Sequence, residues 1–310
     1  MRVILNGKKA GLASVRSAIE RARNEFPVQV RVTWEAGDVH RLVAEAINEE
    51  CPRLVIGGGD GSVKEVVDAI LRQPPDQRPQ LGILPLGTAN DFATSCDIPI
   101  DSLEALRLAQ HGDAHWIDAV SANDEYFINI ASGGFGAQVT ANTPIPLKNF
   151  LGGGAYTLSG LVQALHFEPY DGEIRLPGES IPGKVVVGAV CNGAQAGGGQ
   201  QMAPSARIND GMLDVVGLLD FPPSSAKQVL DELMTPDVSG TYVKRFKAPW
   251  VEWESETTMP INLDGEPIRT KKIRFEVQPN ALQLILPPNC PMLDTGPSRS
   301  SDSVGSVFPE

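Results

Sequence analysis

A glycine-rich turn behind a short apolar run is the part of this sequence most suited to phosphate chemistry. The run Leu54–Ile56 predicts a buried strand. The turn 57–62 (Gly-Gly-Gly-Asp-Gly-Ser) ends this strand, and its glycines allow backbone conformations that few other residues can adopt. Ser62 and Glu65 form a capping-box pattern, which predicts a helix beginning at this point. Because the N–H groups and dipole of a helix N-terminus attract anions, we expect a phosphate site here.

This turn differs from the familiar nucleotide-binding loops. It lacks the Gly-Lys-Ser/Thr of a Walker A loop and the spaced glycines of a Rossmann fingerprint. Asp60 would repel a bare phosphate, so we expect Mg²⁺ or a hydrogen-bond network to mediate the contact. A tight strand-to-helix connection without a ligand is the plainer alternative, but four glycines and a carboxylate exceed what such a connection needs.

Three further polar turns carry groups that could take part in the same chemistry. Residues 87–91 (Gly-Thr-Ala-Asn-Asp) follow another apolar run and fit either a phosphate turn or a capped helix start. Asp264 and Glu266 flank a glycine, and such carboxylates can deprotonate a hydroxyl, although Asp-Gly is also a hairpin signal. The loop 207–212 offers Asp210 and backbone carbonyls to a divalent cation, with an ordinary turn as the favoured alternative.

The elements that must position these turns alternate in the first third of the chain. Strands are predicted at residues 2–6, 28–32, 54–56 and 81–86, with amphipathic helices at 12–26, 37–47 and 62–73. Repeated units of this kind form a parallel sheet covered by helices, and ligand sites lie beyond the carboxyl ends of its strands. Thr33 and the two turns at 57–62 and 87–91 are therefore expected at one edge of the sheet.

The pattern of apolar runs and turn residues changes after about residue 116. Short β-like runs separated by Gly, Pro, Asn and Asp predict an antiparallel sandwich, with runs at 126–131, 184–191, 212–219, 273–277 and 282–286. One helix is expected within residues 147–166, and the composition from Thr295 onward is typical of a disordered tail. The predicted organisation is an α/β domain over residues 1–118, a β-sandwich domain over 119–294, and a tail over 295–310.

Composition limits the classes of partner. The 310 residues are 42% hydrophobic and carry a net charge of −12, which favours a folded protein and argues against nucleic-acid binding. The four scattered cysteines favour a reducing cytoplasm over a disulfide framework. Because no segment is long and apolar enough to span a membrane, we expect a cytoplasmic protein whose membrane contact is transient and peripheral. A homodimer is kept as a hypothesis.

Taken together, these motifs resemble those of the diacylglycerol-kinase-like lipid kinases, most closely the bacterial YegS-type members. The resemblance covers nearly the whole chain, from Val3 to about Leu293. The runs Leu-Pro-Leu-Gly-Thr-Ala-Asn-Asp-Phe-Ala at 84–93 and Leu-Asp-Gly-Glu-Pro at 263–267 are its most specific parts, whereas NAD and sphingosine kinases share the glycine–aspartate turn. The other matching segments lie at 32–38, 57–61, 133–136, 196–201 and 209–211.

The resemblance implies a nucleotide domain like that of NAD and diacylglycerol kinases, a β-sandwich lipid domain and an active site between them. ATP would be bound by Thr33, by Gly58, Gly59, Asp60, Gly61, Ser62, Val63, Lys64 and Glu65, and by Thr88 and Asn90. Mg²⁺ would be held by the side chain of Asp210 and the backbone carbonyls of Arg207 and Met212. Glu266, or its neighbour Asp264, would accept the proton of the lipid hydroxyl.

The predicted function is therefore an ATP- and Mg²⁺-dependent lipid kinase acting on a glycerolipid of the diacylglycerol or phosphatidylglycerol type. A kinase of a soluble hydroxyl compound, related to NAD kinases, is the first alternative. A non-catalytic sensor of nucleotide or lipid is the second, although a sensor need not keep Asp60, Asp210, Asp264 and Glu266.

Overall fold

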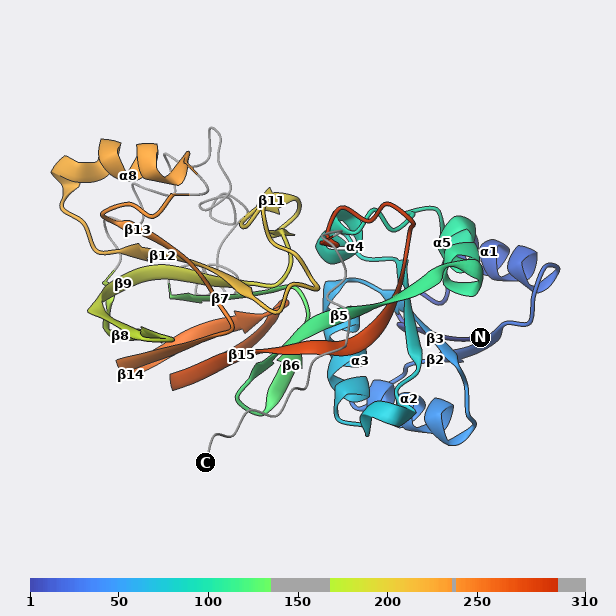
Figure 1. Cartoon of the computed structure of the whole chain (residues 1–310). Coiled ribbons are helices and arrows are strands. Elements are labelled where there is room, and N and C mark those ends of the chain that lie inside the picture. Colours follow the sequence, from blue (N-terminus) through green and yellow to red (C-terminus); the bar gives the residue numbers. More distant parts are fainter. Residues whose placement is uncertain (135–167, 236–237, 295–310) are drawn as a thin grey trace, which may run out of the picture.

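A computed structural model describes residues 1–134, 168–235 and 238–294. Its first part contains four parallel strands in the order β4-β3-β1-β2, and Figure 1 shows helices on both faces of this sheet. The strands are β1 (Arg2–Leu5), β2 (Gln29–Val32), β3 (Arg53–Gly58) and β4 (Gln80–Pro85). The helices are α1 (Ala13–Arg23), α2 (Asp38–Asn48), α3 (Asp60–Leu71), α4 (Asp91–Ser95) and α5 (Ser102–His111).

The apolar strands form the centre of this part because both of their faces are covered. In β1, Val3 and Leu5 pack in a core with α1 and α5, whereas Ile4 faces a second core with α2 and α3. A strand buried on both sides reads as a continuous apolar run, which is why the sequence revealed these strands. The predicted parallel α/β layer is confirmed.

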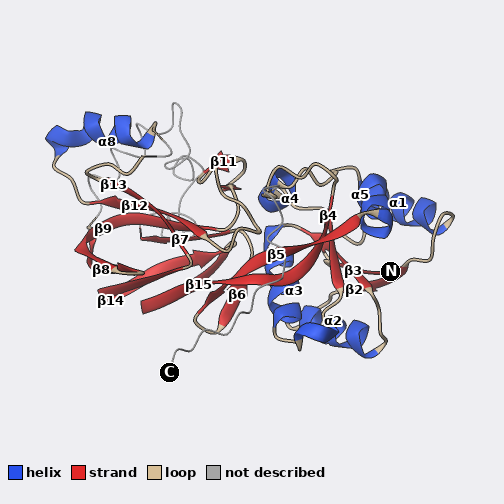
Figure 2. Cartoon of the chain, viewed as in Figure 1, coloured by secondary structure: helices blue, strands red, loops and turns tan. Residues whose placement is uncertain are grey.

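The second part is an antiparallel β-structure, as predicted. Figure 2 shows its strands stacked beside the α/β layer, with one helix at the far end. Its elements are β5 (Asp113–Ala122), β6 (Glu125–Phe127), β7 (Ile130–Gly134), β8 (Tyr170–Leu176), β9 (Glu179–Cys191), β10 (Gln195–Ala196), β11 (Gln200–Gln201), β12 (Leu213–Leu219), α8 (Ala226–Leu233), β13 (Val243–Ala248), β14 (Trp250–Leu263) and β15 (Glu266–Leu286).

Two long strands join the parts. β15 pairs with β14 at its start and with β4 near its end, where Leu284 lies opposite Leu81, and β5 runs antiparallel to β15. The hydrogen-bonded sheet is therefore continuous from β13 to β2. Residue 118, where the first domain was predicted to end, lies inside β5, so the positions on either side are held by one sheet.

Several local predictions need correction. The runs 273–277 and 282–286 belong to one strand, β15, whose pairing with β5 shifts between Gln278 and Leu282. The run 126–131 is instead two strands, β6 and β7, because the intervening backbone N–H groups are bound by a side chain described below. The predicted helix within 147–166 and the predicted tail lie outside the described residues.

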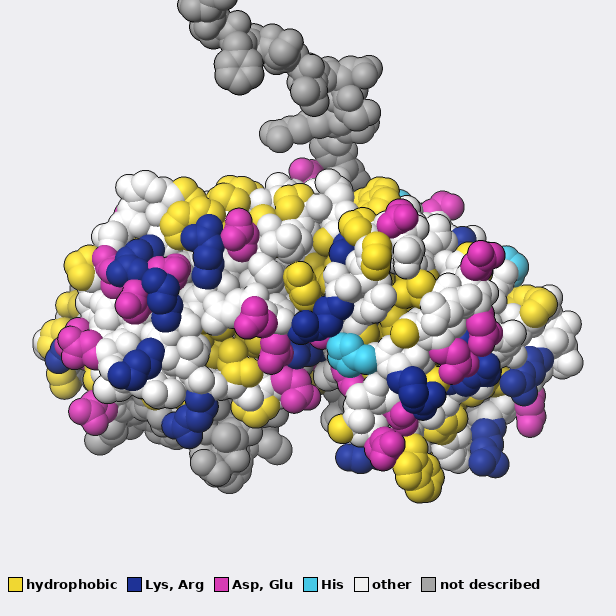
Figure 3. All heavy atoms as spheres, turned by 90° about the horizontal axis from the view of Figure 1, so that it is seen from below, with side chains coloured by type: hydrophobic (Ala, Val, Ile, Leu, Met, Phe, Trp, Pro, Cys, Tyr) yellow, Lys and Arg dark blue, Asp and Glu magenta, His cyan; other side chains and the backbone are white. Residues whose placement is uncertain are grey.

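The surface and the cysteines agree with the composition. On the face shown in Figure 3, positive and negative side chains are interspersed over both halves. The four cysteines are free thiols. No helix in the described residues is long and apolar enough to cross a membrane.

Candidate active site

The carboxyl ends of β1, β2 and β3 lie at one level of the sheet. Leu5, at the end of β1, is opposite Val32 of β2 on one side and Gly57 of β3 on the other. Thr33 and the glycine turn therefore emerge at the same edge, as predicted. At that edge the Gly7 N–H donates to Thr33 Oγ1 over 3.2 Å.

The glycines of the turn are required by close backbone contacts. A Cβ built on Gly58 would lie 2.4 Å from Ser62 Cβ. A Cβ on Gly87 would lie 2.5 Å from Gly59 Cα, so the first and second polar turns touch through backbone alone. A side chain at Gly87 would separate the two turns, and a side chain at Gly58 would collide with Ser62 within the first turn.

The helix behind the turn begins earlier than the capping-box pattern predicted, so that prediction is wrong. α3 starts at Asp60 with Gly59 as its N-cap, and no side chain caps it. Ser62 lies within the first turn of α3, where its hydroxyl accepts a hydrogen bond from Asn6 Nδ2 over 3.3 Å. Val63 is buried under this turn. The helix N-terminus consequently opens directly at the sheet edge, where an anion would be favoured.

The second turn is closed by its own asparagine. Asn90 has a φ of 52°, and its side chain accepts from the Gly87 N–H at 2.7 Å and donates to the Gly87 carbonyl at 3.0 Å. Asn90 also occupies the N-cap position of α4, the helix start that was the alternative expectation for this segment, but its side chain makes no capping hydrogen bond. Thr88 is exposed at the tip of the turn.

Asp60 and Asp91 tie this turn to its surroundings. The Phe92 N–H donates to Asp60 Oδ1 at 3.3 Å, and burial raises the pKa of Asp60, with the charge of Asp91 adding to the shift. The Asp91 carboxylate accepts from the N–H groups of Gly198 and Gly199, at 2.9 and 2.6 Å. These glycines lie between β10 and β11 in the second half, so Asp91 joins the halves beside the site.

Glu266 is the group that the second half brings to the glycine turn. A Cβ built on Gly61 would lie 3.6 Å from Glu266 Oε1, so this carboxylate stands over the first turn of α3. Burial raises the pKa of Glu65 in the same helix, and the nearby charge of Glu266 adds to the increase. Glu266 itself is exposed and thus accessible to a substrate.

Asp264 occupies a different environment from Glu266. Its carboxylate is buried and accepts hydrogen bonds from the backbone N–H groups of Ile128, Asn129 and Ile130, at distances of 2.7 to 3.2 Å. These bonds separate β6 from β7. Burial raises the pKa of Asp264 to about 6. Asp264 and Gly265, both with positive φ, form the expected two-residue hairpin between β14 and β15, which aims Glu266 at the turn.

Lys64, which was predicted to contact ATP, has its side chain engaged elsewhere. Its ammonium group pairs with the carboxylate of Glu125 in β6. Only the backbone of Lys64 therefore remains beside the glycine turn.

The predicted metal loop is anchored in the second half. Asp210 Oδ2 lies 2.8 Å from Lys247 Nζ, which also approaches Asp214 Oδ2 at 3.6 Å. Asp210 Oδ1 accepts a hydrogen bond from the Met212 N–H at 3.0 Å, and the guanidinium group of Arg207 donates to the carbonyl of Ala206. The described residues contain no group of three or more His, Cys, Asp or Glu side chains that could hold a metal ion. The predicted Mg²⁺ site, made of the Asp210 carboxylate and the backbone carbonyls of Arg207 and Met212, stays a prediction.

Comparisons with known proteins agree with this architecture. Residues 1–122 match the diacylglycerol kinase catalytic domain family, and residues 129–286 match the YegS C-terminal NAD kinase beta sandwich-like domain. A "Probable lipid kinase YegS-like" of Shewanella frigidimarina is 48% identical, covering 97% of this chain and 98% of its own. This chain belongs to the YegS-like branch of the diacylglycerol kinase family.

Other relatives of the YegS-like family extend the comparison. A protein of Chromohalobacter salexigens with the same description is 46% identical over 94% of both chains. A crystal structure of a putative diacylglycerol kinase from Bacillus anthracis shares the fold, with a TM-score of 0.75 at 23% identity over 93% of this chain. Family membership makes this chain a kinase.

Two buried acids that hold segments of the candidate site were missed by sequence reasoning. Asp118 accepts from the N–H groups of Gly211 and Asn280, at 2.7 and 2.9 Å, and so holds the predicted metal loop against β15. Asp38 accepts from the N–H groups of Trp34 and Glu35, at 2.7 and 3.1 Å. The available signal for Asp118 was a charged residue inside an apolar strand run.

Proposed function

We propose that this chain transfers the γ-phosphoryl group of ATP, with a divalent cation such as Mg²⁺, to a hydroxyl group of a glycerolipid. The observation that carries the proposal is the position of Glu266, whose carboxylate stands beside Gly61 at the N-terminus of α3. A proton acceptor next to an anion site is the arrangement that phosphoryl transfer to an alcohol requires.

Each group has a role in the proposed reaction. The phosphates of ATP bind at the N-terminus of α3, which begins at Asp60 behind the glycine turn and favours an anion through its N–H groups and dipole. The substrate hydroxyl oxygen attacks the γ-phosphorus, its proton passes to Glu266, and ADP leaves. Asp264 acts as a positioning residue, because its bonds to β6 and β7 fix the hairpin that carries Glu266.

The loop at Asp210 is chemically suited to a hard cation. The carboxylates of Asp210 and Asp214 already converge on one cationic group, Lys247 Nζ. Burial raises the pKa of Asp214, and the charge of Asp210 adds to the increase. Asp210, with the carbonyls of Arg207 and Met212, would hold Mg²⁺. A bound Mg²⁺ supplies charge neutralisation for the phosphates.

A lipid substrate is supported by the relatives, which are described as probable lipid kinases. The acceptor would be of the diacylglycerol or phosphatidylglycerol type and would be met at a membrane surface by transient contact. The acidic composition alone would also suit a soluble acceptor.

A phosphoryl-transfer assay separates the alternatives. Purified protein is incubated with γ-labelled ATP, Mg²⁺ and a total bacterial lipid extract in mixed micelles, and the organic phase is counted and resolved. We expect label in a glycerolipid. Label that appears only in a soluble product would support a soluble acceptor, and saturable ATP binding without any transfer would support a sensor; either result contradicts the proposal.

A further inference from the structure

Trp34 is the most exposed of the large apolar side chains in the described part of the chain. It is 94% exposed, whereas the others range from 43% for Leu12 to 70% for Ile100. Isolated apolar residues on a surface are common and need no explanation by themselves. The case for Trp34 therefore rests on its backbone and on its position.

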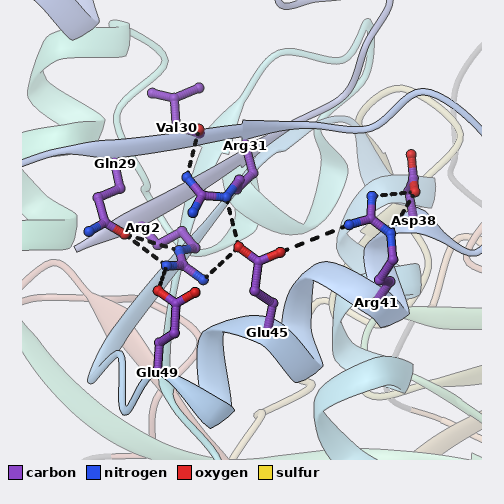
Figure 4. Close-up of polar contacts among 8 residues, drawn as sticks. All are labelled: Arg2, Gln29, Val30, Arg31, Asp38, Arg41, Glu45 and Glu49. Carbon is purple, nitrogen blue, oxygen red and sulfur yellow. Dashed lines mark hydrogen bonds and ion pairs between the residues drawn. The ribbon is translucent and has the colours of Figure 1, made fainter.

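The backbone beneath this ring is held by a network of charged side chains. Asp38 accepts from the Trp34 N–H, and hydrogen bonds from Trp34 and Glu35 together with that from Arg41 lower the pKa of Asp38 to about 2. Figure 4 shows the network continuing from Arg41 to Glu45 and onward to β1 and β2. The Arg41–Asp38 contact is 2.6 Å long.

The far end of the network is anchored in the core. Glu45 Oε1 lies 2.8 Å from Arg31 Nε and 3.5 Å from Arg2 Nη1, and Arg2 is only 1% exposed. Arg2 also pairs with Glu49, the residue that follows the end of α2, as Figure 4 shows. The backbone at Trp34 and Glu35 is thus held by Asp38, which Arg41 and Glu45 link to the buried Arg2, while the ring of Trp34 is almost fully exposed. A rigid backbone presenting a free aromatic face is suited to stacking a planar ligand.

The sheet register brings the backbone that leads to Trp34 level with the backbone that leads to the glycine turn. Val32 and Gly57 both lie opposite Leu5, so Trp34 and Gly59 each follow two residues beyond the same level. β1 alone separates the two strands, so Val32 and Gly57 lie about two strand spacings, or roughly 9.6 Å, apart, and the two segments leave the sheet at that separation. A nucleoside triphosphate carries its base and its terminal phosphates at opposite ends of a molecule of comparable length.

We propose that Trp34 provides the stacking surface for the nucleotide base while the glycine turn binds the phosphates. The inference rests on the proposed function, because it needs the triphosphate at the N-terminus of α3. It assigns to Trp34 a positioning role in nucleotide binding, distinct from the backbone and hydroxyl contacts predicted around it. The Asp38–Arg41 network holds the stacking surface in place.

Isothermal titration of Mg–ATP and of Mg–tripolyphosphate tests this assignment, because the second ligand has phosphates and no base. Trp34→Ala is expected to raise the Kd for ATP roughly tenfold, the lower part of the range for base–aromatic stacking. Its Kd for tripolyphosphate should equal that of the unmodified protein. Trp34→Phe, which retains an aromatic face, should restore most of the ATP affinity. Trp116→Ala, at a half-exposed tryptophan of β5, serves as the control and should change neither value.

The outcomes separate this inference from the proposed function. An unchanged Kd for ATP in Trp34→Ala, or equal weakening of both ligands, would overturn the role of Trp34 while leaving the kinase proposal standing. If Trp34→Ala loses binding to phosphatidylglycerol vesicles but keeps its affinity for ATP, the ring is a membrane contact, and the proposed role of Trp34 in nucleotide binding is equally overturned. If the unmodified protein binds neither ATP nor tripolyphosphate, both proposals are wrong.

Discussion

Replacing Asp264 with asparagine probes the buried carboxylate that positions Glu266. Burial raises its pKa from 3.8 to about 6, so the folded protein binds this proton more tightly than the unfolded chain does. The group therefore adds stability that is complete below pH 3.8 and is lost as the pH rises through about 6. Asparagine does not titrate, so Asp264→Asn removes this pH dependence.

The size of the effect follows from the two pKa values. Between pH 7.5 and pH 5.0 the linkage relation gives about 1.4 kcal/mol of additional stability for the unmodified protein. Urea unfolding of both proteins at the two pH values measures the difference in their free energies of unfolding. We expect that difference to shift by about 1.4 kcal/mol in favour of the unmodified protein at pH 5.0. A difference that is the same at both pH values would refute the reasoning, because it would mean that burial does not perturb this carboxyl group.

Two further changes test, in turn, the contact between the two polar turns and the predicted metal site at Asp210. Gly87→Ala places a methyl group 2.5 Å from Gly59 Cα. It should lower the free energy of unfolding in urea by about 1–3 kcal/mol and slow phosphoryl transfer roughly 100-fold. Gly11→Ala, which adds its methyl group in open space, should change neither quantity. Equal behaviour of the two variants would contradict the close contact. Asp210→Asn should raise the Kd for Mg²⁺, measured by calorimetry, at least roughly tenfold, whereas Asp76→Asn on the surface should leave it unchanged. An unaltered Kd in Asp210→Asn would remove Asp210 from the metal site.

Local sequence signals were sufficient for the parallel sheet and its edge. Strands β1, β3 and β4 are buried on both faces, so each appears in the sequence as a continuous apolar run. The glycine-rich turn after β3 indicates a close backbone contact at the edge of the sheet. Helix α5 and strand β5 were missed, although Asp101 caps α5 by accepting from the N–H groups of Leu103 and Glu104. β5 opens with alternating polar residues that resemble a loop.

The remaining features depend on contacts between distant parts of the chain. The bulged pairing around residues 278–282 interrupts the periodicity of β15, so one strand read as two. The break between β6 and β7 depends on Asp264, and the engagement of Lys64 depends on Glu125. No local pattern distinguishes a carboxylate that binds backbone N–H groups from one that faces a substrate. The sequence accordingly left Asp264 and Glu266 as alternatives, and only their burial and partners separate them.

The measurement that tests the central claim most directly compares Glu266→Gln with Glu256→Gln, an exposed glutamate on β14. ATP affinity and transfer of the γ-phosphoryl group are measured for each variant beside the unmodified protein. If Glu266 accepts the substrate proton, Glu266→Gln should lose roughly 10²- to 10⁴-fold in the transfer rate with its ATP affinity unchanged, and Glu256→Gln should lose neither. A Glu266→Gln variant that transfers at the unmodified rate would contradict the account.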